Sequence, residues 1–104
     1  MAVTMLMVER EVVPGDQARI KELLRELRSH TTRQPGFISG QTVIDAFNPC
    51  VFMTISTWSS MATWQSWEKD PERAPIIESV DELLQGKTRA RLWLHDEEAP
   101  EAGA

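Results

Sequence analysis

Apolar and polar residues along the first half of the chain follow the patterns of a strand, a helix and two further strands. Residues 3–13 are rich in β-branched and apolar side chains, and charge alternates with valine at the end, as in a strand. Residues 17–28 carry apolar side chains at the i, i+3, i+4, i+7 spacing of an amphipathic helix. Residues 37–47 and 50–58 are again strand-like, and the short Asn-Pro turn between them predicts an antiparallel hairpin. Gly40 predicts a bulge or a close backbone approach in the first strand of that hairpin.

The second half of the chain predicts an interrupted helical region and a last strand. Ser59 or Ser60 is a good N-cap for a segment with an apolar residue at every third position. Those residues are Met61, Trp64 and Trp67. Asp70-Pro71 interrupts the helix, and a further apolar stripe runs through residues 75–85. Residues 87–95 then alternate as a strand. One face of this strand carries Arg89, Arg91, Trp93 and His95.

This order of elements, β-α-β-β-α-β, is that of the ferredoxin-like α+β fold. We therefore expect a four-stranded antiparallel sheet with its helices on one face. No repeat or linker divides the chain, so residues 1–95 are predicted to form a single domain. Residues 96–104 are acidic and small and include a proline, and we expect them to form a disordered tail.

The predicted strands are apolar on both of their faces. In the first strand, Leu6 and Val8 alternate with two methionines, and in the last strand Trp93 follows Leu92. Near-continuous apolar runs indicate strands that are covered on both sides. Because the helices cover only one face, we predict a homodimer in which two sheets pack face to face.

Composition disfavours several classes of partner and location. The formal net charge is −5 at pH 7 and the basic residues are scattered, which disfavours nucleic acid and anionic membrane surfaces. The single cysteine, Cys50, cannot form an internal disulfide. The apolar N-terminus has no basic region or cleavage site, so we expect neither a signal peptide nor a membrane span. The expected location is the cytoplasm.

The least ordinary feature of the composition is its four tryptophans. They are Trp58, Trp64, Trp67 and Trp93. One interpretation is that they pack in the core or at an interface. The other is a pocket for a flat conjugated ligand between the second helical region and the open face of the sheet. The pattern alone leaves both interpretations open.

The remaining polar residues carry weak signals of chemistry. His30 ends the first helix, where a cation complements the helix dipole, and His95 ends the last strand as a candidate proton carrier. No spacing of His, Cys or carboxylate residues fits zinc or iron, so we predict no metal site. Arg89 and Arg91 either pair with acidic residues of a neighbouring strand or present cations to an enolate or phenolate ligand.

Three segments carry a resemblance to a known family. They are Pro14-Gly15, the run Gln-Pro-Gly-Phe-Ile-Ser-Gly from Gln34 to Gly40, and Ser56 to Ser60 followed by Trp64, Trp67 and Asp70. In order and spacing they resemble the antibiotic biosynthesis monooxygenase domain family, over residues 3–95. The resemblance implies a dimeric α+β barrel, in which the sheets of two subunits face each other and a cavity lies between each sheet and its helices.

The resemblance also implies an activity. Members of known activity oxidise polycyclic phenols to quinones with molecular oxygen and without metal or flavin. A related branch degrades haem through an Asn on the first strand, a Trp on the second helix and a His ten residues later. The Trp of that pattern matches Trp67, but Glu9 and Ile77 stand at the other two positions, which argues against haem degradation. The chain also contains no tyrosine, although quinone-forming members rely on tyrosines in the pocket.

We therefore predict a cofactor-independent monooxygenase that oxidises a small phenolic or quinol-like aromatic substrate with O2. The predicted catalytic residues are Trp67, Arg91 and His95, and the predicted substrate-binding residues are Trp58, Trp64, Trp67, Phe52 and Trp93. Trp58 and Trp67 would stack on the ring, and Arg91 or His95 would stabilise its anion. No cofactor is expected. The alternative is a non-enzymatic small-molecule binding or accessory protein that uses the same pocket, and haem binding is a weaker third option.

Overall fold

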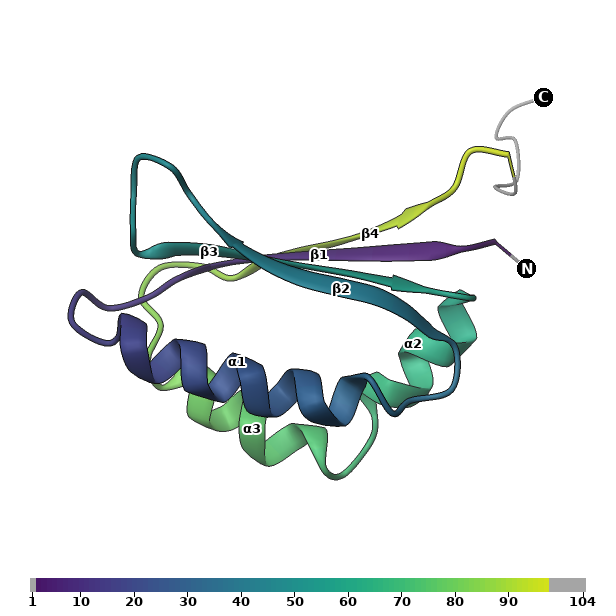
Figure 1. Ribbon diagram of the computed structural model, residues 1–104, viewed down its shortest axis with the longest axis horizontal. Helices are drawn as coiled ribbons and strands as arrows, with labels where there is room; N and C mark the ends of the chain where they lie inside the picture. Colours follow the sequence, from purple (N-terminus) through teal and green to yellow (C-terminus); the bar gives the residue numbers. More distant parts are fainter. Residues whose placement is uncertain (1, 98–104) are drawn as a thin grey trace.

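The computed structural model describes residues 2–97. Its elements are β1 (Thr4–Glu11), α1 (Gln17–Thr31), β2 (Phe37–Ile44), β3 (Val51–Trp58), α2 (Met61–Glu68), α3 (Arg73–Asp81) and β4 (Arg89–Leu94). The strands form an antiparallel sheet in the order β2-β3-β1-β4. All three helices lie on one side of this sheet (Figure 1). The predicted ferredoxin-like fold with helices on one face is confirmed.

The ends of several elements differ from the sequence prediction by a few residues. β2 ends at Ile44 instead of residue 47, because Asp45 starts a turn. Its side-chain carboxylate accepts hydrogen bonds from the backbone N–H groups of Phe47, at 2.8 Å, and Asn48, at 3.1 Å. The helical region does divide near Asp70-Pro71, into α2 and α3. Most of the predicted disordered tail, residues 98–104, lies outside the described residues.

Two clusters of buried side chains lie between the sheet and the helices. The first packs α1 and α3 against β1 and β3, and consists of Val12, Ile20, Leu23, Leu24, Phe52 and Val80. The second packs α2 against β3, and consists of Trp58, Trp64 and Trp67. Burying each of these large apolar side chains stabilises the fold by roughly 1.5–3 kcal/mol. The core is therefore aliphatic at one end of the sheet and aromatic at the other.

The other face of the sheet is apolar at its centre and has no helix over it within residues 2–97 (Figure 1). The strand register places Met7 between Ile55 of β3 and Arg91 of β4, and Met5 beside Trp93. The outward-facing patch consists of Met5, Met7, Val43, Met53, Ile55 and Trp93, and we call it the open-face patch. Trp93 and Val43 are each 43% exposed in the single chain.

The start of β2 is irregular, as Gly40 predicted. The pairing of β2 with β3 shifts register between Phe37 and Ser39. A Cβ atom at Gly40 would lie 3.2 Å from the ring of Phe37, which is a close approach. The Phe37 ring in turn meets Trp58 edge-on, with 5.5 Å between ring centroids. The irregularity therefore lets Phe37 turn inward and join the aromatic cluster.

Candidate functional site

Two local features set the position of α2. Ser60 is its N-cap: the Ser60 hydroxyl accepts from the Thr63 backbone N–H, and the Thr63 hydroxyl accepts from the Ser60 backbone N–H, each at 3.3 Å. Gly36 lies against the same turn, since a Cβ there would approach Thr63 to 2.5 Å. Gly36 also has φ = +84°, which favours glycine. The first turn of α2 is thereby held against the start of β2.

The aromatic cluster, which consists of Trp58, Trp64 and Trp67, fills the space between α2 and β3. Trp58, Trp64 and Trp67 are all at least nine-tenths buried. The indole N–H of Trp58 donates to the Ser56 hydroxyl at 3.0 Å, so this buried polar group is satisfied. A small cavity of about 60 Å³ lies among these tryptophans, with Arg10 and Arg73 also in its lining.

The main cavity adjoins this cluster and has a volume of about 570 Å³. It lies between the inner faces of β1 and β4 on one side and α2 and α3 on the other. Its apolar wall includes Leu6, Val8, Trp64, Ile77, Leu84 and Leu92, and its charged lining includes Arg10, Glu68, Arg73 and Asp81. The volume falls in the range of small-molecule pockets. The sequence placed a ligand pocket between the second helical region and the open face of the sheet, which is wrong, because α2 and α3 lie on the covered face. The resemblance implied a cavity between the sheet and its helices, and such a cavity is present.

Arg10 is the least expected residue of this cavity. It is only 6% exposed, and within residues 2–97 its side chain makes one hydrogen bond, from Nη1 to the Thr54 hydroxyl at 3.4 Å. Its Nε has no hydrogen-bond partner among residues 2–97. Burial, and after it the charge of Arg73, lowers the pKa of the Arg10 guanidinium, while Asp81 opposes the shift.

Arg73 brings a second guanidinium to the same space from the first residue of α3. Burial lowers its pKa as well, and the charges of Glu68 and Asp81 oppose that shift. Across the described part of the chain, neither arginine has a carboxylate oxygen within 4.0 Å. The cavity thus holds two cationic groups whose charges are not directly paired.

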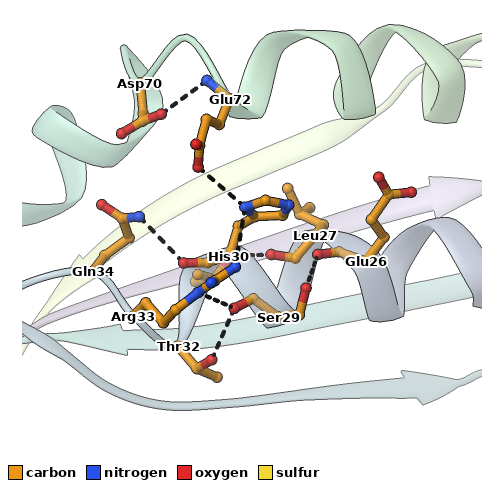
Figure 2. A network of polar contacts seen from close by, with 10 residues as sticks. Glu26, Leu27, Ser29, His30, Thr32, Arg33, Gln34, Asp70 and Glu72 are labelled. Carbon is orange, nitrogen blue, oxygen red and sulfur yellow. Dashed lines mark hydrogen bonds and ion pairs between the residues drawn. The ribbon is translucent and has the colours of Figure 1, made fainter.

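A polar network fixes the loop that leads to Arg73 (Figure 2). The Glu72 carboxylate lies 3.2 Å from Nδ1 of His30, at the end of α1, and the Glu72 backbone N–H donates to the Asp70 carboxylate at 2.8 Å. His30 therefore has a structural contact, as expected for a histidine at a helix C-terminus. The network ties the start of α3 to the end of α1.

Comparison with known proteins identifies the family. The family model described as antibiotic biosynthesis monooxygenase matches residues 4–78. The chain belongs to the antibiotic biosynthesis monooxygenase family. No protein among those with curated descriptions matches the sequence significantly.

Solved structures of similar fold include three that span nearly the whole chain. SnoaB, a cofactor-independent oxygenase from Streptomyces nogalater, is 16% identical with a TM-score of 0.85, covering 97% of this chain and 100% of its own. A candidate antibiotic biosynthesis monooxygenase from Nitrosomonas europaea is 12% identical with a TM-score of 0.86, covering 95% of each chain. A conserved protein from Methanosarcina mazei Go1 is 16% identical with a TM-score of 0.85, covering 89% of this chain and 92% of its own. At these identities the likeness shows the shared fold.

The structure brings some of the residues predicted from the sequence to the two cavities and places the others elsewhere. Trp64 lines the main cavity, and Trp58 and Trp67 line the small cavity beside it. Arg91 borders the main cavity from β4, but the strand register turns its side chain to the open face. Phe52 lies in the aliphatic cluster under α1, among residues that pack the core.

The last strand carries the other two predicted residues. Trp93 lies in the open-face patch, and the guanidinium carbon of Arg91 sits 4.3 Å from the centroid of its ring, a cation–π contact. His95 follows β4, where its backbone N–H donates to the Val3 carbonyl at 3.0 Å. It is exposed and lines neither cavity.

Neither Arg10 nor Arg73 is among the residues predicted from the sequence, although the sequence holds one signal for Arg10. Every second residue of β1 faces inward, namely Thr4, Leu6, Val8 and Arg10, and Val12 continues this phase just after the strand. An arginine in phase with buried valines is a buried cation, and such cations are uncommon without a partner. Nothing comparable marked Arg73, because it starts a short helix with weak periodicity.

Residues 2–97 contain neither a metal-binding cluster nor a helix that could span a membrane. Three or more His, Cys, Asp or Glu side chains do not come together there in an arrangement that could bind a metal ion. Across the same residues, each helix is too short or too polar to cross a bilayer.

Proposed function

We propose that this protein is a cofactor-independent monooxygenase that oxidises a small phenolic or quinol-like aromatic substrate with O2 in the main cavity. The observation that carries the proposal is the cavity of about 570 Å³ in a member of this family. Trp64 and an aliphatic wall lie there beside Arg10 and Arg73, and neither arginine has a carboxylate oxygen within 4.0 Å among residues 2–97. An apolar space with few polar groups suits a flat aromatic ring.

The proposed reaction begins with the substrate anion. A phenolate transfers an electron to O2, and the resulting radicals combine to a peroxide at a ring carbon that carries hydrogen. Loss of water then leaves a quinone, so a phenol and O2 give a quinone and one water. A positive potential near the phenolate oxygen lowers the free energy of the anion, and exclusion of water protects the intermediates.

The position of each residue in or beside the cavity suggests its role in this reaction. Trp64 would stack on the substrate ring, and Arg10 with Arg73 would stabilise negative charge in the cavity. Trp58 and Trp67 would support this wall from behind. Arg91 and His95 stay our predictions for charge stabilisation and proton transfer at the β4 side.

Oxygen uptake over a panel of phenols, hydroquinones and naphthols tests the proposal. We expect turnover that Trp64→Ala reduces at least ~10-fold, because the stacking surface positions the ring. Phe47→Ala is the matched control, since Phe47 is 98% exposed. Failure of every substrate in the panel to consume O2 would overturn the proposal.

A non-enzymatic binding or accessory role is the second candidate, and the composition of the cavity favours it. None of the described lining residues is His, Tyr, Cys or Ser, and the two carboxylates of the lining, Glu68 and Asp81, belong to exposed residues. The described wall therefore has no buried proton carrier of the usual kind. Tight binding of an aromatic ligand without oxygen consumption would establish this role and exclude catalysis.

We also propose that the protein is a homodimer through the open-face patch. Apolar side chains on both faces of the strands need cover on both sides, and the helices supply it on one side only. A second sheet packed face to face would bury the patch. The cytoplasm is the proposed location.

A further inference from the structure

Arg10 is a buried cation without an adequate partner. Of its five N–H donors, one reaches Thr54 over 3.4 Å, and Nε is buried with no partner among residues 2–97. Removing a guanidinium from water is costly unless hydrogen bonds and opposite charge replace the water. A second guanidinium, that of Arg73, lines the same cavity and adds repulsion.

The two carboxylates of the cavity do not neutralise this pair directly. Glu68 and Asp81 line the cavity but belong to exposed residues, and neither comes within 4.0 Å of a guanidinium nitrogen in the described part of the chain. Arg10 is buried and Arg73 is partly buried. The buried part of the lining therefore carries positive charge, and the carboxylates belong to its exposed part.

We propose that Arg10 and Arg73 form a binding site for the carboxylate of an aromatic acid, whose ring lies along Trp64 and the aliphatic wall. This inference rests on the proposed function and deepens it, because it makes the substrate a hydroxylated aromatic carboxylate. A guanidinium presents paired N–H donors that match the two oxygens of a carboxylate. A monoanion fits better than a phosphate dianion, because Glu68 and Asp81 repel a second negative charge.

Matched probes test the site by titration calorimetry on the whole protein. The probes are 1-hydroxy-2-naphthoate and 1-naphthol, which share the ring and the hydroxyl and differ in the carboxylate. We expect the acid to bind the wild type at least ~10-fold more tightly than the naphthol, a typical effect of one charge-assisted pair. Arg10→Met should bring the two affinities within about twofold, because Met keeps the apolar stem and removes the charge.

Two further variants sharpen the result. Arg73→Met should reduce the preference for the acid by a smaller factor, since Arg73 is less buried than Arg10. Arg19→Met is the control: Arg19 is exposed on α1, its side chain is 57% accessible, and it should leave the preference unchanged.

Thermal unfolding separates binding from a structural role of Arg10. If Arg10 serves a ligand, Arg10→Met should unfold at the wild-type temperature or above it, because an unpaired buried charge is removed. A lower unfolding temperature with equal loss of both probes would assign Arg10 to the structure and overturn the site. Equal affinity of the wild type for acid and naphthol would also overturn it.

The anion site and the proposed reaction can fail separately. Preference for the acid without O2 uptake leaves the site standing and removes the reaction. O2 uptake on neutral phenols, with no preference for the acid, leaves the reaction standing and removes the site.

Discussion

The two faces of the sheet differ in what their side chains are suited to contact. The covered face is interrupted by a cavity that contains two arginines and is closed elsewhere by aliphatic and aromatic clusters. The open face is continuous and apolar at its centre, with Arg89, Arg91 and Glu9 near its β4 side. The contrast teaches that apolar character alone does not mark a binding pocket: the apolar face without buried charge is suited to another sheet, and the face with buried charge is suited to a ligand.

The largest expected effect comes from placing charge in the open-face patch. Met7→Glu combined with Ile55→Glu, which are register partners on the central strands, should convert a dimer into monomers. Two carboxylates buried in a sheet-to-sheet interface would lack partners and cost several kcal/mol. Light scattering after size exclusion measures the mass, and circular dichroism checks that the monomer stays folded.

Arg19→Glu is the control for this comparison. Its side chain is 57% exposed on α1, on the opposite side of the sheet from the patch (Figure 1), and the mass should not change. A dimer that survives both patch substitutions would show that the open face is not the interface.

The covered face can be divided further into a packed half and a hollow half. Phe52→Ala should lower the free energy of unfolding by about 3–5 kcal/mol, because Phe52 is 1% exposed in the aliphatic cluster. Leu92→Ala should cost less than ~1.5 kcal/mol, because Leu92 is 37% exposed on the cavity wall and its removal enlarges existing space. Urea denaturation measures both values. Equal costs would mean that the cavity is filled in solution.

Local structure could be predicted from the sequence, but the face of the sheet that the helices cover could not. The Trp64 and Trp67 spacing and the Ser60 cap predicted α2 and its buried side, because both depend on neighbouring residues. Strand alternation divides β4 into two faces correctly, but a period of two does not say which face the helices cover. That is decided by the pairing of Leu92 with Leu6, a contact between distant segments, and it places Trp93 on the open face.

The burial of Arg10 also could not be predicted from its local sequence. Its neighbours Glu9 and Glu11 make the end of β1 look solvated in the sequence. In the fold, the inward phase set by Val8 and Val12 carries Arg10 into the cavity, where Arg73 meets it from a helix more than sixty residues later in the chain. Charge is easy to count in a sequence, but its burial depends on tertiary packing.

A smaller effect is expected at the start of α2, which sets the aromatic half of the covered face. Ser60→Ala removes the acceptor for the Thr63 backbone N–H and should cost about 1 kcal/mol of unfolding free energy. Ser59→Ala is the neighbouring control, because Ser59 is exposed and precedes the cap. Urea denaturation measures both costs. Equal costs for the two serines would show that the capping box does not stabilise the start of α2.

The smallest effect concerns the network that holds the start of α3. Glu72→Gln should cost less than ~0.5 kcal/mol, because the side chain of Glu72 is 67% exposed and exposed ion pairs contribute little. High salt should abolish that small difference, since it screens the pair. If the network positions Arg73 for a ligand, the variant should also weaken the preference for 1-hydroxy-2-naphthoate over 1-naphthol, by up to about twofold. If stability changes and that preference does not, the contact between Glu72 and His30 serves only to join α1 to α3. Arg10 would then be the main source of the preference for a carboxylate on the covered face.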